Sequence, residues 1–432
     1  MPHVAIIGTC DTKLHELLWL RSEILAISQD QCKVTLVDVG RTRTSHEHIN
    51  VGQDVITSKY APKGHEQDVS KLSRGEVIKY MIKCASNWLR EAHQRGQQYP
   101  SEALHGVVSA GGTGGTSLIS GVMREALPIG FPKLIVSTAA SGDTGPIVEE
   151  MDITLMYSVV DIAGTNSLLK RVLSNAAGAI VGMSQACERS MKEASEAERD
   201  DSKQQKKKLV GLTMFGVTTP CVDRVRQYLE ENHPIECFVF HCTGHGGKAM
   251  ERLVSEGVLD AVLDITTTEI CDQLMGGVMD AGPHRLEAAL KAGIPNIISV
   301  GATDMVNFGP KSTVPERYQN RKLYEHNPTV TLMRTSPEEC AAIGQFIVDK
   351  VKKFARVRGF VEVVLPKGGV SMIAVPDGPF YDPQADEALF STIEKGLAGS
   401  GIALSSVDSA INDEAFAVDV AKRLVTMMGL NE

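Results

Sequence analysis

The sequence lacks three features that would each place it in a broad class of protein. No hydrophobic run in its 432 residues is long enough to span a bilayer, and residues 1–8 are typical of a buried strand, not of a signal sequence. No long basic block offsets the net charge of -9, so most of the surface would repel nucleic acid. We therefore expect a soluble, cytoplasmic protein that binds neither a membrane nor a nucleic acid.

Paired cysteines are missing as well. The nine cysteines are odd in number and scattered, with no C-x-x-C pair, which favours reduced thiols over a disulfide framework or a zinc knot. His241, Cys242 and His245 lie close in sequence, but two neighbouring glycines argue against the helix that a metal site with this spacing needs. We expect no metal site. No H-E-x-x-H, G-x-S-x-G or protein-kinase signature is present, so no nucleophile can be named.

What the sequence does contain is a repeated alternation of apolar runs and amphipathic helical segments. Runs of four to eight buried residues followed by helices are typical of βα units with mostly parallel sheets. With this length and 43% hydrophobic residues, the pattern predicts an α/β fold of two Rossmann-like, doubly wound domains. The expected strands cover residues 4–7, 33–40, 106–108, 133–137, 153–160, 209–215, 237–241, 260–265, 296–300, 330–333, 361–365 and 402–406.

A polar stretch over residues 191–208 separates the two series. It carries both charge signs in blocks and almost no apolar side chain, so it cannot help to fill a core. We predict an N-terminal nucleotide-binding domain over residues 1–195, a charged linker over 196–208 and a C-terminal α/β domain over 209–432. A second polar segment, residues 41–74, lacks periodicity and is expected to form a long loop.

The first domain is organised around a glycine-rich hexamer that lies between an apolar run and a helix. Its residues are Gly111, Gly112, Thr113, Gly114, Gly115 and Thr116. Four glycines in six positions indicate positive φ angles or a ligand that approaches the backbone closely. The free N–H groups and the positive dipole end of a helix start favour an anion, above all a phosphate. A tight turn without a ligand is the alternative.

The Walker lysine and the Ser or Thr that follows it are absent from this hexamer. Any phosphate would therefore be held by backbone N–H groups and by the hydroxyls of Thr113 and Thr116.

Two further polar loops follow neighbouring strands of the same domain. They contain Thr9, Asp11 and Thr12 in the first loop and Ser141, Gly142 and Asp143 in the second. Each group alone is well explained as a helix cap. Because the carboxyl ends of parallel strands meet at one edge of a sheet, where open α/β folds bind ligands, the three loops together favour one shared site.

The second domain has a glycine-rich loop of its own, over residues 243–249. It fits G-x-G-x-x-A, and Asp264 lies 20 residues beyond Gly244, as in a dinucleotide fingerprint. The loop follows the second strand of its domain, however, whereas that fingerprint normally follows the first. A structural turn, an anionic ligand and a nicotinamide cofactor all stay open. The residues of this predicted second anion site are Gly244, Gly246, Gly247 and Lys248.

Carboxylates also follow later strands of the second domain. Glu269 and Asp304, together with Asp272, are the best acid/base candidates if the protein catalyses a reaction. Surface or capping roles are the alternative for each of them.

Eight short motifs in order along the chain resemble those of the Tm-one-like family, over about residues 4–430. They are Gly8-Thr-x-Asp-Thr-Lys13, Gly111-Gly-Thr-Gly-Gly-Thr116, Ser137-Thr-x-Ala-Ser-Gly-Asp143, Phe215-Gly-Val-Thr-Thr-Pro-Cys221, Thr243-Gly-x-Gly-Gly-x-Ala-Met-Glu251, Asp264-x-Thr-Thr-Thr-Glu269, Val306-Asn-Phe-Gly309 and His326-Asn-Pro-x-x-Thr-Leu-Met-Arg-Thr335. That family includes the ATP-binding N-terminal domain of plant tobamovirus-resistance proteins and many microbial proteins.

The resemblance implies two Rossmann-like subdomains, a homodimer, and ATP as ligand of the first subdomain, with or without Mg²⁺. In the plant proteins the same region binds and blocks a viral replication helicase, and the chain continues into a TIM-barrel domain that has no counterpart in these 432 residues. A TIM-barrel protein or a viral helicase is thus a partner implied by resemblance alone. The strand-end argument places the nucleotide over the glycine hexamer.

Three functional interpretations follow from these patterns. The first is nucleotide binding, with a regulatory or partner-binding role. The alternative is a hydrolase-like or transferase-like enzyme that acts on a small anionic metabolite in a cleft between the domains, held by residues 244–248 with Glu269 or Asp304 as acid/base. A regulatory dimer whose glycine loops only turn the chain is a third possibility.

Overall fold

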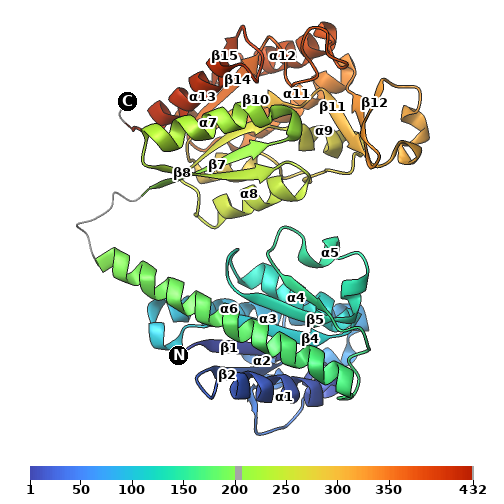
Figure 1. The fold of residues 1–432 in the computed structure, drawn as a ribbon, viewed down its shortest axis with the longest axis vertical. Helices are drawn as coiled ribbons and strands as arrows, with labels where there is room; N and C mark the ends of the chain where they lie inside the picture. The colour runs from blue at the N-terminus through green and yellow to red at the C-terminus, as the bar shows by residue number, and fades with distance from the viewer. Residues whose placement is uncertain (200–206, 431–432) are drawn as a thin grey trace. The chain divides into compact units, whose positions relative to one another are not determined.

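The structure, a computed structural model, describes residues 1–199 and 207–430, and the chain divides into two units, Met1–Lys203 and Gln204–Glu432 (Figure 1). Each unit is built on its own six-stranded parallel sheet with helices on both faces. The predicted α/β fold with two Rossmann-like, mostly parallel sheets is confirmed. Within the described part of the chain, no helix is both long enough and apolar enough to cross a membrane.

The first sheet has the strand order β3-β2-β1-β4-β5-β6. Its strands are β1 (His3–Gly8), β2 (Lys33–Asp38), β3 (Ile49–Val51), β4 (Gly106–Gly111), β5 (Lys133–Ser137) and β6 (Thr154–Tyr157). From β1 the chain moves outward through β2 and β3, then returns to place β4 on the other side of β1. The strand order therefore reverses between β1 and β4, and open α/β sheets bind their ligands outside the carboxyl ends of strands at such a point.

Alternation along β1 explains how the sheet holds a helix layer on each face. Val4 and Ile6 belong to the hydrophobic core on one face, and Ala5 and Ile7 belong to the core on the other. The first core is closed by α1 (Cys10–Ile27) and α6 (Ser167–Arg199). The second is closed by α2 (Gln53–Lys59), α3 (Arg74–Gln98) and α4 (Thr113–Ala126), and the short α5 (Gly145–Val148) contacts α4.

The second sheet has the order β15-β14-β10-β9-β7-β8, so its reversal lies between β7 and β9. Its strands are β7 (Lys208–Met214), β8 (Ile235–His241), β9 (Ala261–Thr266), β10 (Asn296–Gly301), β14 (Val361–Pro366) and β15 (Ala403–Val407). One face is covered by α7 (Thr219–Asn232) and α13 (Glu414–Met427). The other carries α9 (Thr268–Met275), α10 (Glu287–Ala292), α11 (Pro337–Phe354) and α12 (Pro383–Leu397), and α8 (His245–Ser255) packs on α10 and β8.

A small antiparallel sheet, in the order β11-β13-β12, adds to the second unit. Its strands are β11 (Met305–Phe308), β12 (Leu323–Asn327) and β13 (Val330–Arg334). Of these three, only β13 was predicted as a strand. β12 gives no apolar signal, because four of its five residues are exposed. Short 3₁₀ turns complete the structure: η1 (Val69–Lys71), η2 (Pro100–Glu102), η3 (Thr138–Ser141), η4 (Gly216–Thr218), η5 (Lys311–Thr313), η6 (Glu316–Tyr318) and η7 (Arg358–Phe360).

Two polar segments differ from their predicted form. Residues 41–74 are not one long loop, because they contain β3, α2 and η1, which bury Ile56 and Val69. Helix α6 runs on to Arg199, and β7 already starts at Lys208. The ends of the predicted linker therefore belong to regular elements, and residues 200–206 lie outside the described part of the chain.

Candidate functional site

A pocket of about 470 Å³ lies at the carboxyl ends of β1 and β4, where the strand order of the first sheet reverses. This volume falls in the range of small-molecule binding sites. The turn between β1 and α1, the turn between β4 and α4, and the two ends of the 41–74 segment supply most of its lining. The lining residues are Thr9, Asp11, Thr12, Lys13, Val39, Arg41, Arg74, Val77, Ile78, Gly111, Gly112, Thr113, Gly114, Gly115 and Leu118.

The glycine-rich turn presents the uncapped start of α4 to this pocket. Gly112 is the N-cap residue, Thr113 is the first residue of the helix, and no side chain of the described residues accepts a hydrogen bond from the first turn. The N–H groups of Thr113, Gly114 and Gly115 have no carbonyl one turn earlier in the helix to pair with. Three backbone donors at the positive end of a 14-residue helix therefore line the pocket.

The glycines of this turn are not needed for their φ angles. None of the four has a positive φ, so that part of the prediction is wrong. At Gly111 the explanation is packing, because a Cβ would lie 3.2 Å from the Cα of Gly115. At Gly115 a Cβ would meet nothing within 4 Å, and at Gly112 it would meet only Thr138 Oγ1, at 3.8 Å. At these two positions glycine leaves the backbone open toward the pocket.

Basic side chains outnumber acidic ones around the pocket. Lys13, Arg41 and Arg74 carry positive charges, and Asp11 carries the one negative charge of the lining residues. A Cβ on Gly114 would lie 3.2 Å from a guanidinium nitrogen of Arg74, so this cation lies directly beside the glycine turn. Neither arginine forms an ion pair within residues 1–199 and 207–430; Arg41 donates instead to the carbonyls of Ser70 and Leu72, at 3.1 and 2.8 Å.

The β1–α1 turn is held by hydrogen bonds other than the helix cap considered for it from the sequence. Thr9 does not cap α1 with its side chain; its hydroxyl pairs with that of Thr12 at 2.9 Å. Asp38, at the end of β2, accepts from the N–H groups of Cys10 and Gly40 at 3.0 and 2.9 Å, and burial raises the pKa of this carboxyl. Asp11 accepts from the N–H of Arg41 at 2.9 Å and so ties residue 41 to the pocket.

Four predicted residues do not line this pocket. The Thr116 hydroxyl is buried and pairs with Ser137 Oγ at 2.6 Å, and the Thr116 N–H donates to the carbonyl of Gly112. Ser141, Gly142 and Asp143 follow β5 and are absent from the lining. Asp143 accepts from the N–H of Gly145 at 3.0 Å, a local contact at the start of α5, where Thr144 and not Asp143 is the N-cap residue. The structure therefore joins two of the three predicted loops.

The second glycine-rich loop already holds an anion, which is a side chain of the same unit. The N–H groups of Gly244 and Gly247 donate to Glu269 Oε1 at 2.8 and 3.0 Å, and Arg285 Nε donates to the other carboxylate oxygen at 2.9 Å. An external anion at Gly244, Gly246, Gly247 and Lys248 would have to displace this buried carboxylate. Asp264, which the dinucleotide fingerprint would use for a ribose, instead pairs with Arg285.

The proposed acid/base side chains are enclosed in the same unit. Glu269, Asp272 and Asp304 have no exposed surface. Burial raises the pKa of Asp272 to about 7 and that of Asp304 to about 7. Ser371 donates to one oxygen of Asp304 at 2.9 Å. A substrate could reach these carboxyls only after the surrounding structure had moved.

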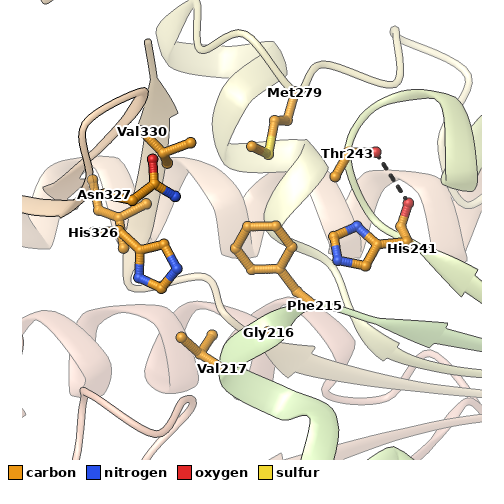
Figure 2. Close-up of a pocket in the computed structure, with 10 residues that line it drawn as sticks. Phe215, Gly216, Val217, His241, Thr243, Met279, His326, Asn327 and Val330 are labelled. Atoms are coloured by element: carbon orange, nitrogen blue, oxygen red, sulfur yellow. Dashed lines mark hydrogen bonds between the residues drawn. The ribbon is translucent and has the colours of Figure 1, made fainter. Parts of the chain in front are cut away.

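A smaller hollow of about 200 Å³ lies in the second unit, at the carboxyl ends of β7 and β8 and beside β12 and β13 (Figure 2). Figure 2 shows the ring of Phe215 between the imidazoles of His241 and His326. Sequence reasoning considered His241 only as an unfavourable zinc ligand. Among the described residues, no cluster of three His, Cys, Asp or Glu side chains is arranged to hold a metal, and all nine cysteines are unpaired.

Comparisons with known proteins agree over nearly the whole chain. Residues 2–189 match the N-terminal domain, and residues 207–428 the C-terminal domain, of the Uncharacterised protein family (UPF0261). The chain belongs to this family. It is 41% identical over 425 residues to a UPF0261 protein of Clostridium tetani, covering 98% of both chains, and 42% identical over 418 residues to one of Rhizobium meliloti, covering 96% of this chain and 97% of that one.

The UPF0261 chain is also similar to a plant protein. It is 41% identical over 431 residues to the ToMV resistance protein Tm-1(GCR237) of Solanum lycopersicum, covering 96% of this chain but 54% of the tomato protein. The resemblance to the Tm-one-like family is thereby confirmed, although the chain spans about half the length of that relative. The solved UDP-GlcNAc 2-epimerase from Neisseria meningitidis aligns with a TM-score of 0.20 and 10% identity over 91% of this chain and 100% of the other, which is too low to indicate a shared ligand.

The two arginines that line the UPF0261 pocket are not among the site residues predicted from the sequence. Arg41 and Arg74 are the two ends of the segment predicted as a long loop, and both are exposed. Exposed arginines in a segment without periodicity carry no signal of their own. Only the topology could have indicated them. The segment follows β2 and leads into α3, so both of its ends lie near the carboxyl end of β1.

Proposed function

We propose that this chain binds ATP in the pocket at the carboxyl ends of β1 and β4. The observation that carries the proposal is the uncapped start of α4, where the bare backbone of Gly112 and Gly115 faces open space. The N–H groups of Thr113, Gly114 and Gly115 would donate to phosphate oxygens, as helix N-termini commonly do. No lysine of a Walker loop is needed in this arrangement.

The charged and apolar walls of the pocket suit the two ends of a nucleotide. Arg74 and Arg41 would neutralise phosphate charge, and their planar guanidinium groups match phosphate geometry. Val77, Ile78 and Leu118 supply an apolar surface for the base or ribose. A Mg²⁺ ion would enter bound to the triphosphate. The resemblance to the Tm-one-like family supports ATP over other phosphorylated ligands.

Isothermal titration of the full chain with ATP, ADP, AMP and adenosine tests this proposal. Because the amides and arginines contact phosphates, the affinity should fall by roughly tenfold for each phosphate removed. Equal affinities across the series would contradict phosphate recognition, and the absence of any ATP binding would contradict the proposal as a whole.

The enzyme alternative has less support. Glu269 and Asp304 are enclosed, and Glu269 already fills the glycine loop that would have bound an anionic metabolite. A cleft between the two domains, a homodimer and a protein partner stay predictions of the sequence and of the family resemblance.

A further inference from the structure

We infer that the hollow at the carboxyl ends of β7 and β8 is a second ligand site, which takes a small organic acid with a flat apolar body. This inference does not depend on ATP binding, because every residue that lines the hollow belongs to the second unit. β7 is also one of the two strands that flank the reversal of the second sheet, which is where such sheets bind ligands.

The floor of the hollow is apolar and rigidly placed. Phe215, Val217 and Leu332 are buried side chains of one hydrophobic cluster, and Met279 and Val330 pack against that cluster. The same five residues line the hollow, so its floor is formed by the side of this hydrophobic cluster that faces the hollow. At about 200 Å³ the hollow is smaller than drug-sized ligand sites, which limits its occupant to a body of about one ring.

Aromatic groups shape this floor into a place for a flat molecule. The rings of Phe215 and His241 are 5.6 Å apart between centroids and tilted by 57°. Figure 2 shows His326 on the opposite side of Phe215 and Met279 close to the same ring. Flat rings pack well in such surroundings, by stacked or edge contacts with aromatic side chains and by contact with sulfur.

The rim of the hollow supplies hydrogen-bond donors without a partner. Asn327 Oδ1 already accepts from the N–H and the hydroxyl of Thr329, at 2.9 and 2.8 Å, so the Asn327 NH₂ group is left to donate. That nitrogen is turned toward Phe215 (Figure 2). The imidazoles of His241 and His326 form no hydrogen bond or ion pair within the described residues, and each has at least one nitrogen that can donate.

The available donors on the rim, together with the lack of a carboxylate in the lining, favour a negatively charged ligand. No carboxylate lines the hollow, whereas an amide NH₂ and two imidazoles do. The Thr243 hydroxyl is engaged with the carbonyl of His241 at 3.4 Å, the bond that is dashed in Figure 2. A carboxylate has two acceptor oxygens and a negative charge, so it can accept hydrogen bonds from the donors on this rim. An apolar ring attached to it can pack on the apolar floor.

Benzoate is the probe for this site, and benzamide is its uncharged counterpart of the same shape. We expect ligand-observed NMR titrations of the full chain to detect benzoate binding, with benzamide at least tenfold weaker. His326→Ala and Asn327→Ala should each weaken benzoate binding at least fivefold. Both side chains are exposed, so these changes leave the core intact.

A blocking variant tests the location of the site. A Cβ on Gly216 would meet nothing within 4 Å, and Gly216 lines the hollow, so Gly216→Trp should fill it without a backbone clash and abolish benzoate binding. Gly359→Trp is the matched control, because Gly359 also lies in a 3₁₀ turn with open space at its Cβ but does not line the hollow. Equal benzoate affinity in both variants, equal affinity for benzamide, or no benzoate binding to the unaltered chain would each overturn the inference.

Discussion

At the scale of single residues, the proposed ATP site predicts that Arg74 is the side chain on which phosphate affinity most depends. It lies beside Gly114, it is exposed, and it has no ion-pair partner within the described residues. Arg74→Ala should lower ATP affinity by roughly 10- to 100-fold, because a charge-assisted hydrogen bond contributes about 1.5–3 kcal/mol. The loss should be much smaller for adenosine, which titration calorimetry can measure directly.

Arg43→Ala is the control for this change. Arg43 belongs to the same segment but is 70% exposed, lies 3.6 Å from Asp54 and does not line the pocket. Its removal should leave ATP affinity unchanged within about twofold. If both variants lost affinity equally, general electrostatic attraction and not the pocket would explain binding.

Asp304 makes a prediction about stability and pH. Burial raises the pKa of its carboxyl to about 7, so the folded chain holds a proton there that the unfolded chain releases above about pH 4. The free energy of unfolding contributed by Asp304 therefore falls as pH rises from about 4 to about 7, by up to about 4 kcal/mol, and is constant above that. Asp304→Asn removes this titration.

Denaturant unfolding of the second unit between pH 5 and pH 8 checks this sign. The free energy of unfolding of Asp304→Asn, relative to the unaltered chain, should increase over this interval. Parallel pH curves for the two proteins would show that Asp304 does not titrate in the folded state.

The sequence could place a residue in the pocket where its position follows from the end of its own strand, but not where its side-chain direction depends on packing. The backbone of the glycine turn, and Thr9 and Thr12, could be assigned to one pocket because strand-end residues of neighbouring strands meet at one edge. The direction of a side chain could not be assigned, because Thr116 turns inward to Ser137 only as a result of packing between α4 and β5.

At the scale of elements, strands and helices with an apolar pattern were predictable and polar ones were not. β1, β4 and α4 each bury a continuous or periodic set of side chains. β12 is exposed and β3 has three residues, so neither carries a pattern that hydrophobic periodicity can detect. Their positions come from pairing with neighbours that lie elsewhere in the sequence.

The start of α8 gives a prediction for one buried ionic cluster. Glu269 accepts from Gly244 and Gly247 and pairs with Arg285, which is also paired with Asp264. Glu269→Ala should lower the free energy of unfolding by about 3–5 kcal/mol, because it leaves buried donors and part of a buried cation without a partner. ATP affinity in the first unit should be unchanged.

Asp223→Asn provides the comparison for that measurement. Asp223 lies 3.8 Å from Arg226, both side chains are at least half exposed, and its loss should cost less than about 1 kcal/mol. A Glu269→Ala variant as stable as Asp223→Asn would show that the glycine loop does not need the internal carboxylate, and the loop would again be a candidate for an external anion.

At the scale of the whole molecule, the two-unit organisation was predictable because each unit has its own cores. Separate hydrophobic clusters cover the two faces of each parallel sheet. What the sequence could not supply was the strand order, since the reversals between β1 and β4 and between β7 and β9 follow from crossover connections.

Hydrogen exchange with and without ATP should show this organisation directly. All residues that line the proposed nucleotide pocket belong to the first unit. ATP should slow exchange in peptides that cover residues 8–13, 38–42 and 111–118 and leave exchange in residues 207–430 unchanged. If ATP slowed hydrogen exchange only in the second unit, the nucleotide would not bind in the proposed pocket.

The most direct test of the central claim substitutes one glycine whose missing side chain leaves the pocket open. Gly115→Leu adds a side chain in open space within α4, and Gly182→Leu makes the same change in α6, away from the pocket. Both should keep or raise stability, by about 0.5–1 kcal/mol, because leucine favours helix over glycine. Titration calorimetry should find ATP affinity at least tenfold lower in Gly115→Leu and unchanged in Gly182→Leu; equal and undiminished affinity in both would contradict a phosphate site on the bare backbone of this turn.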